Sequence, residues 1–254
     1  MQAVSLLVSS LAMAAAAGLV GSVAVMRRMT LASDAISHVA LPGIGLAMLL
    51  GFNPVLGGVL ALFAGILLVW GIERKTRIPT EAVIGVVFSA ALAVGSMLTN
   101  GEELIEALFG SGRIQTSAEL LAGLVTAGIV IAFCLLAGSR LVIALVSPDI
   151  ARTAGIDVSR LDLLYLLAFA LTVALGLRYL GVLLMGSLII IPATTAKHLS
   201  RNLRQMCGLS VAIAMASTLA GSLLAQSLRV PAGPLTITLA AAVFFLGLLR
   251  RAVA

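Results

Sequence analysis

The sequence predicts an all-α protein, a polytopic bundle of transmembrane helices. Of its 254 residues, 61% are hydrophobic and only 10% are charged, whereas soluble domains carry about a quarter charged residues. The apolar residues form long runs without the period-two alternation of membrane β-barrel strands. This composition excludes a soluble enzyme, a disordered chain and a disulfide-stapled secreted domain.

The number of spans follows from the runs that lack charge. No Asp, Glu, Lys or Arg occurs in 1–26, 35–72, 82–101, 120–139, 163–177, 179–196, 205–228 and 230–249. A helix needs about 20 apolar residues to cross the hydrocarbon, and the turn signal Gly51-Phe52-Asn53-Pro54 divides 35–72 into two spans. We predict about nine spans in a single domain, residues 1–254. The count is eight if 163–177 and 179–196, separated by Arg178, form one broken element.

The placement of Lys and Arg predicts the orientation. With the N-terminus outside and the C-terminus in the cytoplasm, thirteen of the sixteen basic residues fall on the inner side, as the positive-inside rule requires. The net charge of +6 then reflects the topology of the chain. The expected surroundings are membrane lipid, and no nucleic-acid partner is expected. The chain contains no Walker A pattern and no HExxH motif, so we expect it not to be an enzyme.

Asp34 and His38 form the ionisable pair beside or inside the apolar region. At positions i and i+4 they share one helix face and can touch one ligand. A carboxylate with an imidazole suits Zn²⁺ or Mn²⁺, whereas Mg²⁺ or Ca²⁺ favours oxygen ligands alone. Intramembrane ionisable groups are usually functional. The alternative is structural: Asp34 caps the helix or pairs with Arg28, and His38 makes a packing hydrogen bond.

Pro42 adds a backbone argument. A proline inside a helix leaves the carbonyl four residues earlier without its donor, here that of His38. We expect this carbonyl, or the backbone at Pro42-Gly43, to face a polar pathway, because unpaired backbone in a membrane needs a cavity or a protein partner. The alternative is an ordinary kink relieved by Ser37 or by a neighbouring helix. Pro192 likewise frees the Leu188 carbonyl, which the following threonines, 194 and 195, are expected to re-satisfy.

One Asp and one His are too few ligands for a tight site. Two copies that face each other across an axis would supply two carboxylates and two imidazoles, which suffice for tetrahedral zinc or a partly hydrated manganese ion. We therefore predict a second copy of the same chain as a partner. The metal is cargo, and no permanently bound cofactor is expected.

The inner segment SPDIARTAGID predicts a helix of about two turns at 147–156. Ser147 can cap it, Pro148 suits its first position, Asp149 meets its positive end, and Gly155 can end it. The small residues Ala151 and Ala154, beside Arg152, would let this helix lie in a groove of a cytoplasmic partner. Alternatively, it is a connection that packs under the bundle. On the outer side, 101–110 predicts an amphipathic interfacial helix.

Three motifs in order resemble a known family: RRMTLASDAISHVALPGIGLA, then the long segment from SPDIARTAGID to TTAKHLS, then VPAGP. Together they resemble the membrane permease subunits of bacterial zinc and manganese ABC importers (ABC-3 type), along nearly the whole chain. The resemblance implies a type II ABC importer-like bundle in the bacterial inner membrane. It implies metal passage at Asp34 and His38, and contact with the ATPase through a separate set of residues. That set is Asp149, Ala151, Arg152 and Gly155.

The resemblance also implies the partners and the mechanism. They are a second permease copy, a cytoplasmic ATP-binding subunit and an external metal-binding protein, which together move zinc or manganese by alternating access. We favour zinc over manganese because zinc generally binds N/O sites more tightly. The alternatives are a self-sufficient secondary carrier or channel for cations, driven by an ion gradient, and a structural subunit that would tolerate Asp34→Asn and His38→Gln.

Overall fold

The computed structural model describes residues 2–76, 78–98, 116–179, 181–228 and 230–252. Throughout these ranges the regular structure is helical. The helices are α1 (Gln2–Met26), α2 (Thr30–His38), α3 (Ala40–Leu50), α4 (Pro54–Lys75), α5 (Thr80–Leu98), α7 (Ser117–Val146), α8 (Pro148–Thr153), α9 (Val158–Tyr179), α10 (Gly181–Leu199), α11 (Leu203–Leu228) and α12 (Ala232–Ala252). The predicted interfacial helix at 101–110 lies outside the described residues.

Seven of the described helices are long and apolar enough to cross a membrane: α1, α4, α5, α7, α9, α11 and α12. The predicted count of about nine is not confirmed. One missing span corresponds to α2 and α3, with 9 and 11 residues. Their apolar part, Asp34–Leu50, is shorter than the helices counted as spans. The other is α10, which holds Pro192 and ends with Lys197 and His198. Because α9 is a candidate span alone, the eight-span alternative gains no support.

Local sequence signals set the helix ends. Asn53 caps α4 by accepting hydrogen bonds from the backbone N–H groups of Val55 (2.9 Å) and Leu56 (3.4 Å), and Gly51 adopts φ 73° in the preceding turn. This confirms the predicted turn between the two parts of 35–72. A reciprocal capping box between Thr116 and Glu119 begins α7.

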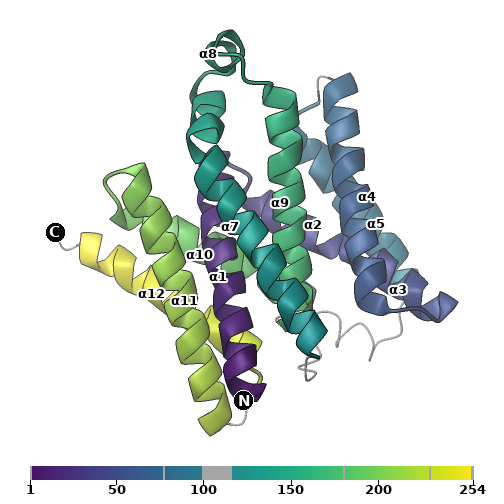
Figure 1. Cartoon of the computed structure of the whole chain (residues 1–254), viewed down its shortest axis with the longest axis vertical. Coiled ribbons are helices and arrows are strands. Elements are labelled where there is room, and N and C mark those ends of the chain that lie inside the picture. The colour runs from purple at the N-terminus through teal and green to yellow at the C-terminus, as the bar shows by residue number, and fades with distance from the viewer. Residues whose placement is uncertain (1, 77, 99–115, 180, 229, 253–254) are drawn as a thin grey trace.

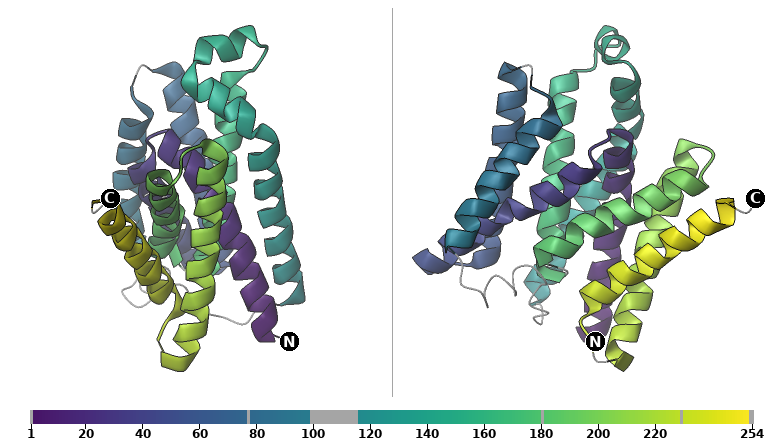
Figure 2. Two further views of the ribbon diagram at one scale, coloured as in Figure 1. Left: turned by 90° about the vertical axis from the view of Figure 1, so that its left-hand side faces the viewer. Right: turned by 180° about the vertical axis from the view of Figure 1, so that it is seen from behind.

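The helices form three groups (Figure 1). One group consists of α3, α4 and α5, a second of α10, α11 and α12, and α1, α7 and α9 lie between them. Seen from behind, α2 and α10 run obliquely to the long helices (Figure 2). The short α2 packs against α10 on one side and against α5 on the other. Both α2 and the residues it carries therefore lie where the groups meet.

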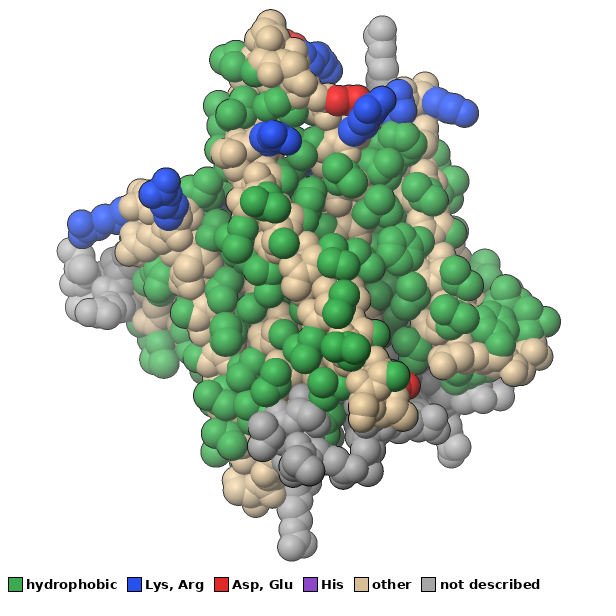
Figure 3. Space-filling model, viewed as in Figure 1, with side chains coloured by type: hydrophobic (Ala, Val, Ile, Leu, Met, Phe, Trp, Pro, Cys, Tyr) green, Lys and Arg blue, Asp and Glu red, His purple; other side chains and the backbone are tan. Residues whose placement is uncertain are grey.

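The surface suits a lipid environment. Hydrophobic side chains cover the middle of the face in Figure 3. Large apolar residues such as Val86, Met97 and Leu136 are 70%, 86% and 80% exposed. The Lys and Arg side chains on this face gather toward the end of the molecule that carries α8. This face of the molecule therefore has an apolar middle and one basic end (Figure 3).

Candidate functional site

The candidate site lies next to an interruption of the helix at Val39. Helix α2 ends at His38 and α3 begins at Ala40, with the Val39 N–H donating to the Ile36 carbonyl (3.0 Å). Pro42 lies in the first turn of α3, where a missing N–H costs least, and it cannot donate to the His38 carbonyl. The proline thus accounts for the one-residue interruption at Val39, whose backbone stays close to helical (φ −63°, ψ −17°).

Asp34 and His38 both belong to α2, as predicted. The His38 side chain is buried, with 8% of the residue exposed, and its Nδ1 has no hydrogen-bond partner among the described residues. Asp34 is half-buried and lies one helical turn before His38. Buried polar atoms without a partner are rare in folded proteins. The His38 Nδ1 atom is therefore not committed to a hydrogen bond with any described residue.

The structural alternative for this pair is not observed in the described residues. Asp34 is the fifth residue of α2, too far along to cap it. The ion pairs present there join Arg27 to Asp162, Arg152 to Asp149 and Arg160 to Asp157, and none includes Asp34 or Arg28.

Two residues that the sequence patterns did not identify hold this pair in place. Gly186 of α10 lies directly against Asp34: a Cβ at this glycine would be 2.9 Å from Asp34 Cα and 2.9 Å from its Oδ1. Phe88 of α5 contributes a ring whose centroid is 5.5 Å from that of His38, an ordinary distance for tilted aromatic packing. These contacts join segments far apart in sequence, so no local spacing could have identified them.

The chain supplies an incomplete ligand set. No group of three or more His, Cys, Asp or Glu side chains able to hold a metal occurs in the part of the chain that the structure describes. A zinc site usually takes four ligands. Asp34 and His38 would supply two of these four ligands, so the described residues alone do not make a complete zinc site.

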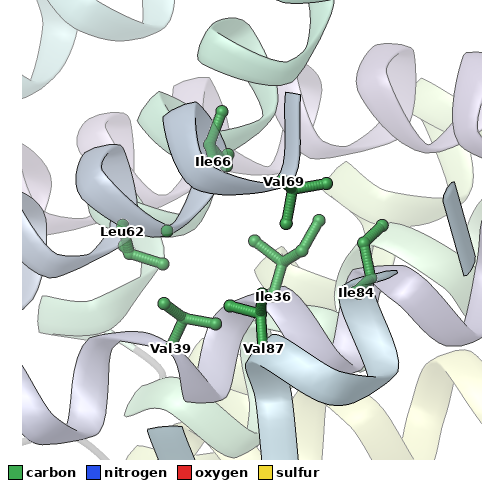
Figure 4. Close-up of a pocket in the computed structure, with 8 residues that line it drawn as sticks. Ile36, Val39, Leu62, Ile66, Val69, Ile84 and Val87 are labelled. Atoms are coloured by element: carbon green, nitrogen blue, oxygen red, sulfur yellow. The ribbon is translucent and has the colours of Figure 1, made fainter. Parts of the chain in front are cut away.

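Behind α2 lies a small apolar cavity of about 10 Å³ (Figure 4). Ile36 and Val39 come from α2 and its end, and aliphatic side chains of α4 and α5 complete the lining. A void of this size with no polar partners stays dry. The face of α2 opposite the ionisable pair is therefore sealed by hydrocarbon, so a hydrated ion has no route on that side.

The segment 147–156 forms the predicted helix, α8. Ser147 accepts a hydrogen bond from the Ile150 N–H (3.3 Å), Pro148 is the first helical residue, and Gly155 adopts φ 77° after the end. Asp149 and Arg152 are exposed and form an ion pair at 3.1 Å.

Ala151 differs from its predicted role in α8. It is fully buried within its own chain, and its carbonyl accepts from the Ile156 N–H (2.9 Å). An alanine with no exposed surface cannot reach a partner protein. Its small side chain instead lets α8 pack closely against the end of the bundle. The side chains of Ile150, Arg152 and Ala154 remain exposed on the protein surface.

The remaining predicted residues lie in helix contacts. Gly43 faces Gly57 of α4 so closely that a Cβ on either glycine would overlap the carbonyl oxygen of the other.

Pro192 lies inside α10. The Thr195 hydroxyl donates to the Ile191 carbonyl (2.7 Å), and the Thr194 hydroxyl oxygen has no partner among the described residues. The expectation that these threonines serve the Leu188 carbonyl was wrong, because the hydroxyl reaches four residues back rather than to the carbonyl that the proline frees.

Comparison with known proteins assigns the chain as a whole. The model of the ABC 3 transport family matches residues 1–251. The chain belongs to the ABC 3 transport family. This agrees with the resemblance seen in the three sequence motifs and gives no support to a gradient-driven carrier.

Several members of the ABC 3 transport family are similar along most of their length. The chain is 30% identical to the high-affinity zinc uptake system membrane protein ZnuB of Haemophilus influenzae, over 91% of this chain and 90% of that protein. It is 28% identical to the manganese transport system membrane protein MntC of Listeria monocytogenes, over 96% of this chain and 88% of that protein. Relatives named for zinc and for manganese are thus about equally similar.

The fold is shared with a solved structure of PsaBC from Streptococcus pneumoniae in complex with Fab. The TM-score is 0.81 at 24% sequence identity, with 95% of this chain and 89% of that chain covered. At this identity the likeness establishes the fold alone. The chain therefore shares the overall fold of that solved structure.

Proposed function

We propose that this chain is the membrane permease subunit of an ATP-driven importer of a divalent transition metal. The observation that carries the proposal is the buried His38, whose Nδ1 has no partner among the described residues, one helical turn from Asp34. Membership of the ABC 3 transport family and the similarity to zinc and manganese permeases support it.

The cargo is proposed to be zinc in preference to manganese. An imidazole and a carboxylate serve either ion, but zinc binds N/O ligands more tightly and accepts four of them. A second copy of the chain, related by a two-fold axis, would bring a second Asp34 and His38 to the same ion and complete the tetrahedron. The metal is a substrate in transit, so the site needs enough affinity to select it and little enough to release it.

The energy is proposed to come from a separate cytoplasmic ATP-binding subunit. The exposed Asp149, Ile150 and Arg152 of α8, with Gly155 at its end, offer that subunit a contact surface. An external metal-binding protein would deliver the ion on the opposite face. ATP binding and hydrolysis would then alternate the side to which the permease dimer opens.

The proposed orientation in a bacterial inner membrane places α8 in the cytoplasm. The basic side chains gather at that end (Figure 3), as the positive-inside rule requires. The N-terminus of α1 lies toward the opposite end (Figure 1), so it is assigned to the outside. The C-terminus follows Arg250 and Arg251 and is assigned to the cytoplasm by the positive-inside rule.

The bends in the helices are proposed to shape the pathway. Pro42 frees the His38 carbonyl beside the ionisable pair, and Gly43 lets α3 approach α4. Pro192 weakens α10 a little beyond Gly186, which touches Asp34. Each of these residues lies on an element that contacts α2 or continues it.

The test is the metal content of metal-starved cells that express the chain with its encoded neighbours. Element-resolved mass spectrometry would compare the wild type with Asp34→Ala, His38→Ala and His38→Gln at matched membrane expression. We expect a selective gain of zinc or manganese in the wild type and its loss in all three variants. The metal that accumulates identifies the cargo.

The chain offers a matched control, since it has only two histidines. His198 is exposed near the end of α10 and packs edge-on against Phe244, so His198→Gln should accumulate metal like the wild type. An unchanged metal profile in His38→Gln, or no metal gain in a well-expressed wild type associated with its ATPase, would contradict the proposal.

A further inference from the structure

A charged contact joins the end of α1 to the start of α9. The Arg27 guanidinium donates to Asp162 Oδ1 at 2.6 Å, and the two side chains are 13% and 30% exposed. The same guanidinium lies over the ring of Tyr165, 4.6 Å from its centroid. An ion pair with this much burial and a second partner holds its geometry far better than an exposed pair does.

Tyr165, whose ring packs against the Arg27 guanidinium, is itself held in place by α1. Its side chain is fully buried, and its hydroxyl donates to the Val20 carbonyl of α1 at 3.1 Å. Helix α9 is therefore attached to α1 at two points, one through Asp162 and one through Tyr165. Arg27 lies between them and cannot change rotamer without losing both of its partners.

On one side, the contact leads to α8. The first turn of α9 begins only a few residues after α8, and the Ile156 N–H donates to the carbonyl of buried Ala151. The Ser159 carbonyl, in that same turn, accepts from Trp70 Nε1 of α4 at 3.2 Å. The segment between α8 and α9 is therefore bonded to α8, and Asp162 is the fifth residue of the helix that follows it.

On the other side, the contact leads to α2. Arg27 is followed by a tight turn in which Arg28 adopts φ 60° and the Met29 N–H donates to the Ala24 carbonyl (2.9 Å). Left-handed backbone is rare for a residue other than glycine, and such residues cluster at switch regions. Helix α2 begins at Thr30, so Asp34 is only seven residues beyond Arg27.

We propose that Arg27 and Asp162 are positioning residues that couple the α8–α9 segment to α2 and its Asp34–His38 pair. This rests on the proposed function. When the ATPase moves α8, the N-terminal end of α9 displaces Arg27 through Asp162, and the turn at Arg28 passes the displacement to α2. The pair touches neither metal nor ATP, so its effect is on how much transport each ATP produces.

The experiment uses the complete importer, with the permease, its ATP-binding subunit and its metal-binding protein reconstituted in liposomes. The metal that cells accumulate is supplied on the binding protein, and ATP hydrolysis and metal uptake are measured together. Asp162→Asn keeps the shape of the side chain and removes its charge. Arg27→Gln removes the cation, and Arg27→Lys retains it.

We expect Asp162→Asn and Arg27→Gln to lower the metal transported per ATP hydrolysed by at least about threefold, within the range for residues along a coupling route. ATP hydrolysis should stay within about twofold of the wild type, and Arg27→Lys should recover most of the ratio. The matched control is Ser159→Ala in the same turn of α9, since the Ser159 hydroxyl has no partner among the described residues. It should leave the ratio unchanged.

The outcomes separate this inference from the proposed function. An unchanged ratio in Asp162→Asn, with a working wild type, would overturn the inference and leave the metal permease intact. A parallel loss of uptake, ATP hydrolysis and thermal stability would mean that the ion pair only supports the fold, which also overturns it. A wild-type complex that moves neither zinc nor manganese would refute the proposed function, and this inference with it.

Discussion

Gly186→Ala is the substitution that most directly tests whether the position of Asp34 matters. The added Cβ would lie 2.9 Å from Asp34 Cα, at least about 0.5 Å inside the 3.4–4 Å of ordinary contact. Asp34 Oδ1 is equally close and Ser37 Oγ is 3.2 Å away. Because a backbone atom is involved, no side-chain rotation relieves the overlap, and α2 must move away from α10.

A shift of this size is large for a metal site. Ligands must be held within about 0.5 Å of the productive geometry, and misplacement by about 1 Å can cost about a hundredfold in rate. We expect Gly186→Ala to reduce metal uptake at least about tenfold at matched membrane expression. The assay is the initial rate of metal accumulation, with thermal unfolding of the purified permease measured in parallel.

Gly208→Ala in α11 is the matched control. Gly208 is exposed and nothing lies within 4 Å of where its Cβ would be, so this alanine should be tolerated and should favour the helix by up to about 1 kcal/mol. Uptake by Gly186→Ala at the wild-type rate would refute the claim that contact with α10 positions Asp34. Loss of uptake in both variants would show that the assay reports general damage.

Three further predictions follow from single contacts. Pro42→Ala restores an N–H that can donate to the His38 carbonyl, so it should join α2 to α3 and lower uptake or change metal selectivity; wild-type uptake and selectivity would remove Pro42 from the pathway. Ser147→Ala deletes the cap that accepts from the Ile150 N–H, which costs about 0.5–2 kcal/mol, so less ATPase should co-purify with the permease; Ser147→Asp should restore it, and full retention by the alanine variant would count against α8 as the contact. Tyr165→Phe removes the buried hydrogen bond to the Val20 carbonyl and should lower the free energy of unfolding by about 1 kcal/mol, seen as a lower melting temperature; an unchanged melting temperature would mean that the hydroxyl contributes nothing.

Short sequence patterns were enough to predict features that depend only on neighbouring residues, such as the two ends of α8. The cap, proline and left-handed glycine of α8 lie within nine residues of one another, and all three occupy the predicted positions. The placement of Asp34 and His38 on one helix was confirmed for the same reason. A spacing of four residues on a helix is a property of the backbone alone.

The rest depends on contacts between distant segments, which the apolar patterns do not specify. Hydropathy predicted one span across 35–50, but the helix is interrupted at Val39, where Pro42 removes the N–H that would donate to the His38 carbonyl. The apolar run also gave no sign that Gly186 meets Asp34 or that Phe88 meets His38. Ala151 was predicted to face a partner because it is small, whereas burial against its own chain explains the same property.

The central claim, that the ion is bound by the Asp34–His38 pair, can be tested by X-ray absorption at the zinc edge. The purified permease would be loaded with Zn²⁺ alone. The account predicts nitrogen and oxygen ligands at about 2.0–2.2 Å with imidazole scattering that disappears in His38→Gln and persists in His198→Gln. Imidazole scattering that persists in His38→Gln would contradict the account. Zinc that binds the wild type and shows no imidazole scattering would contradict it as well.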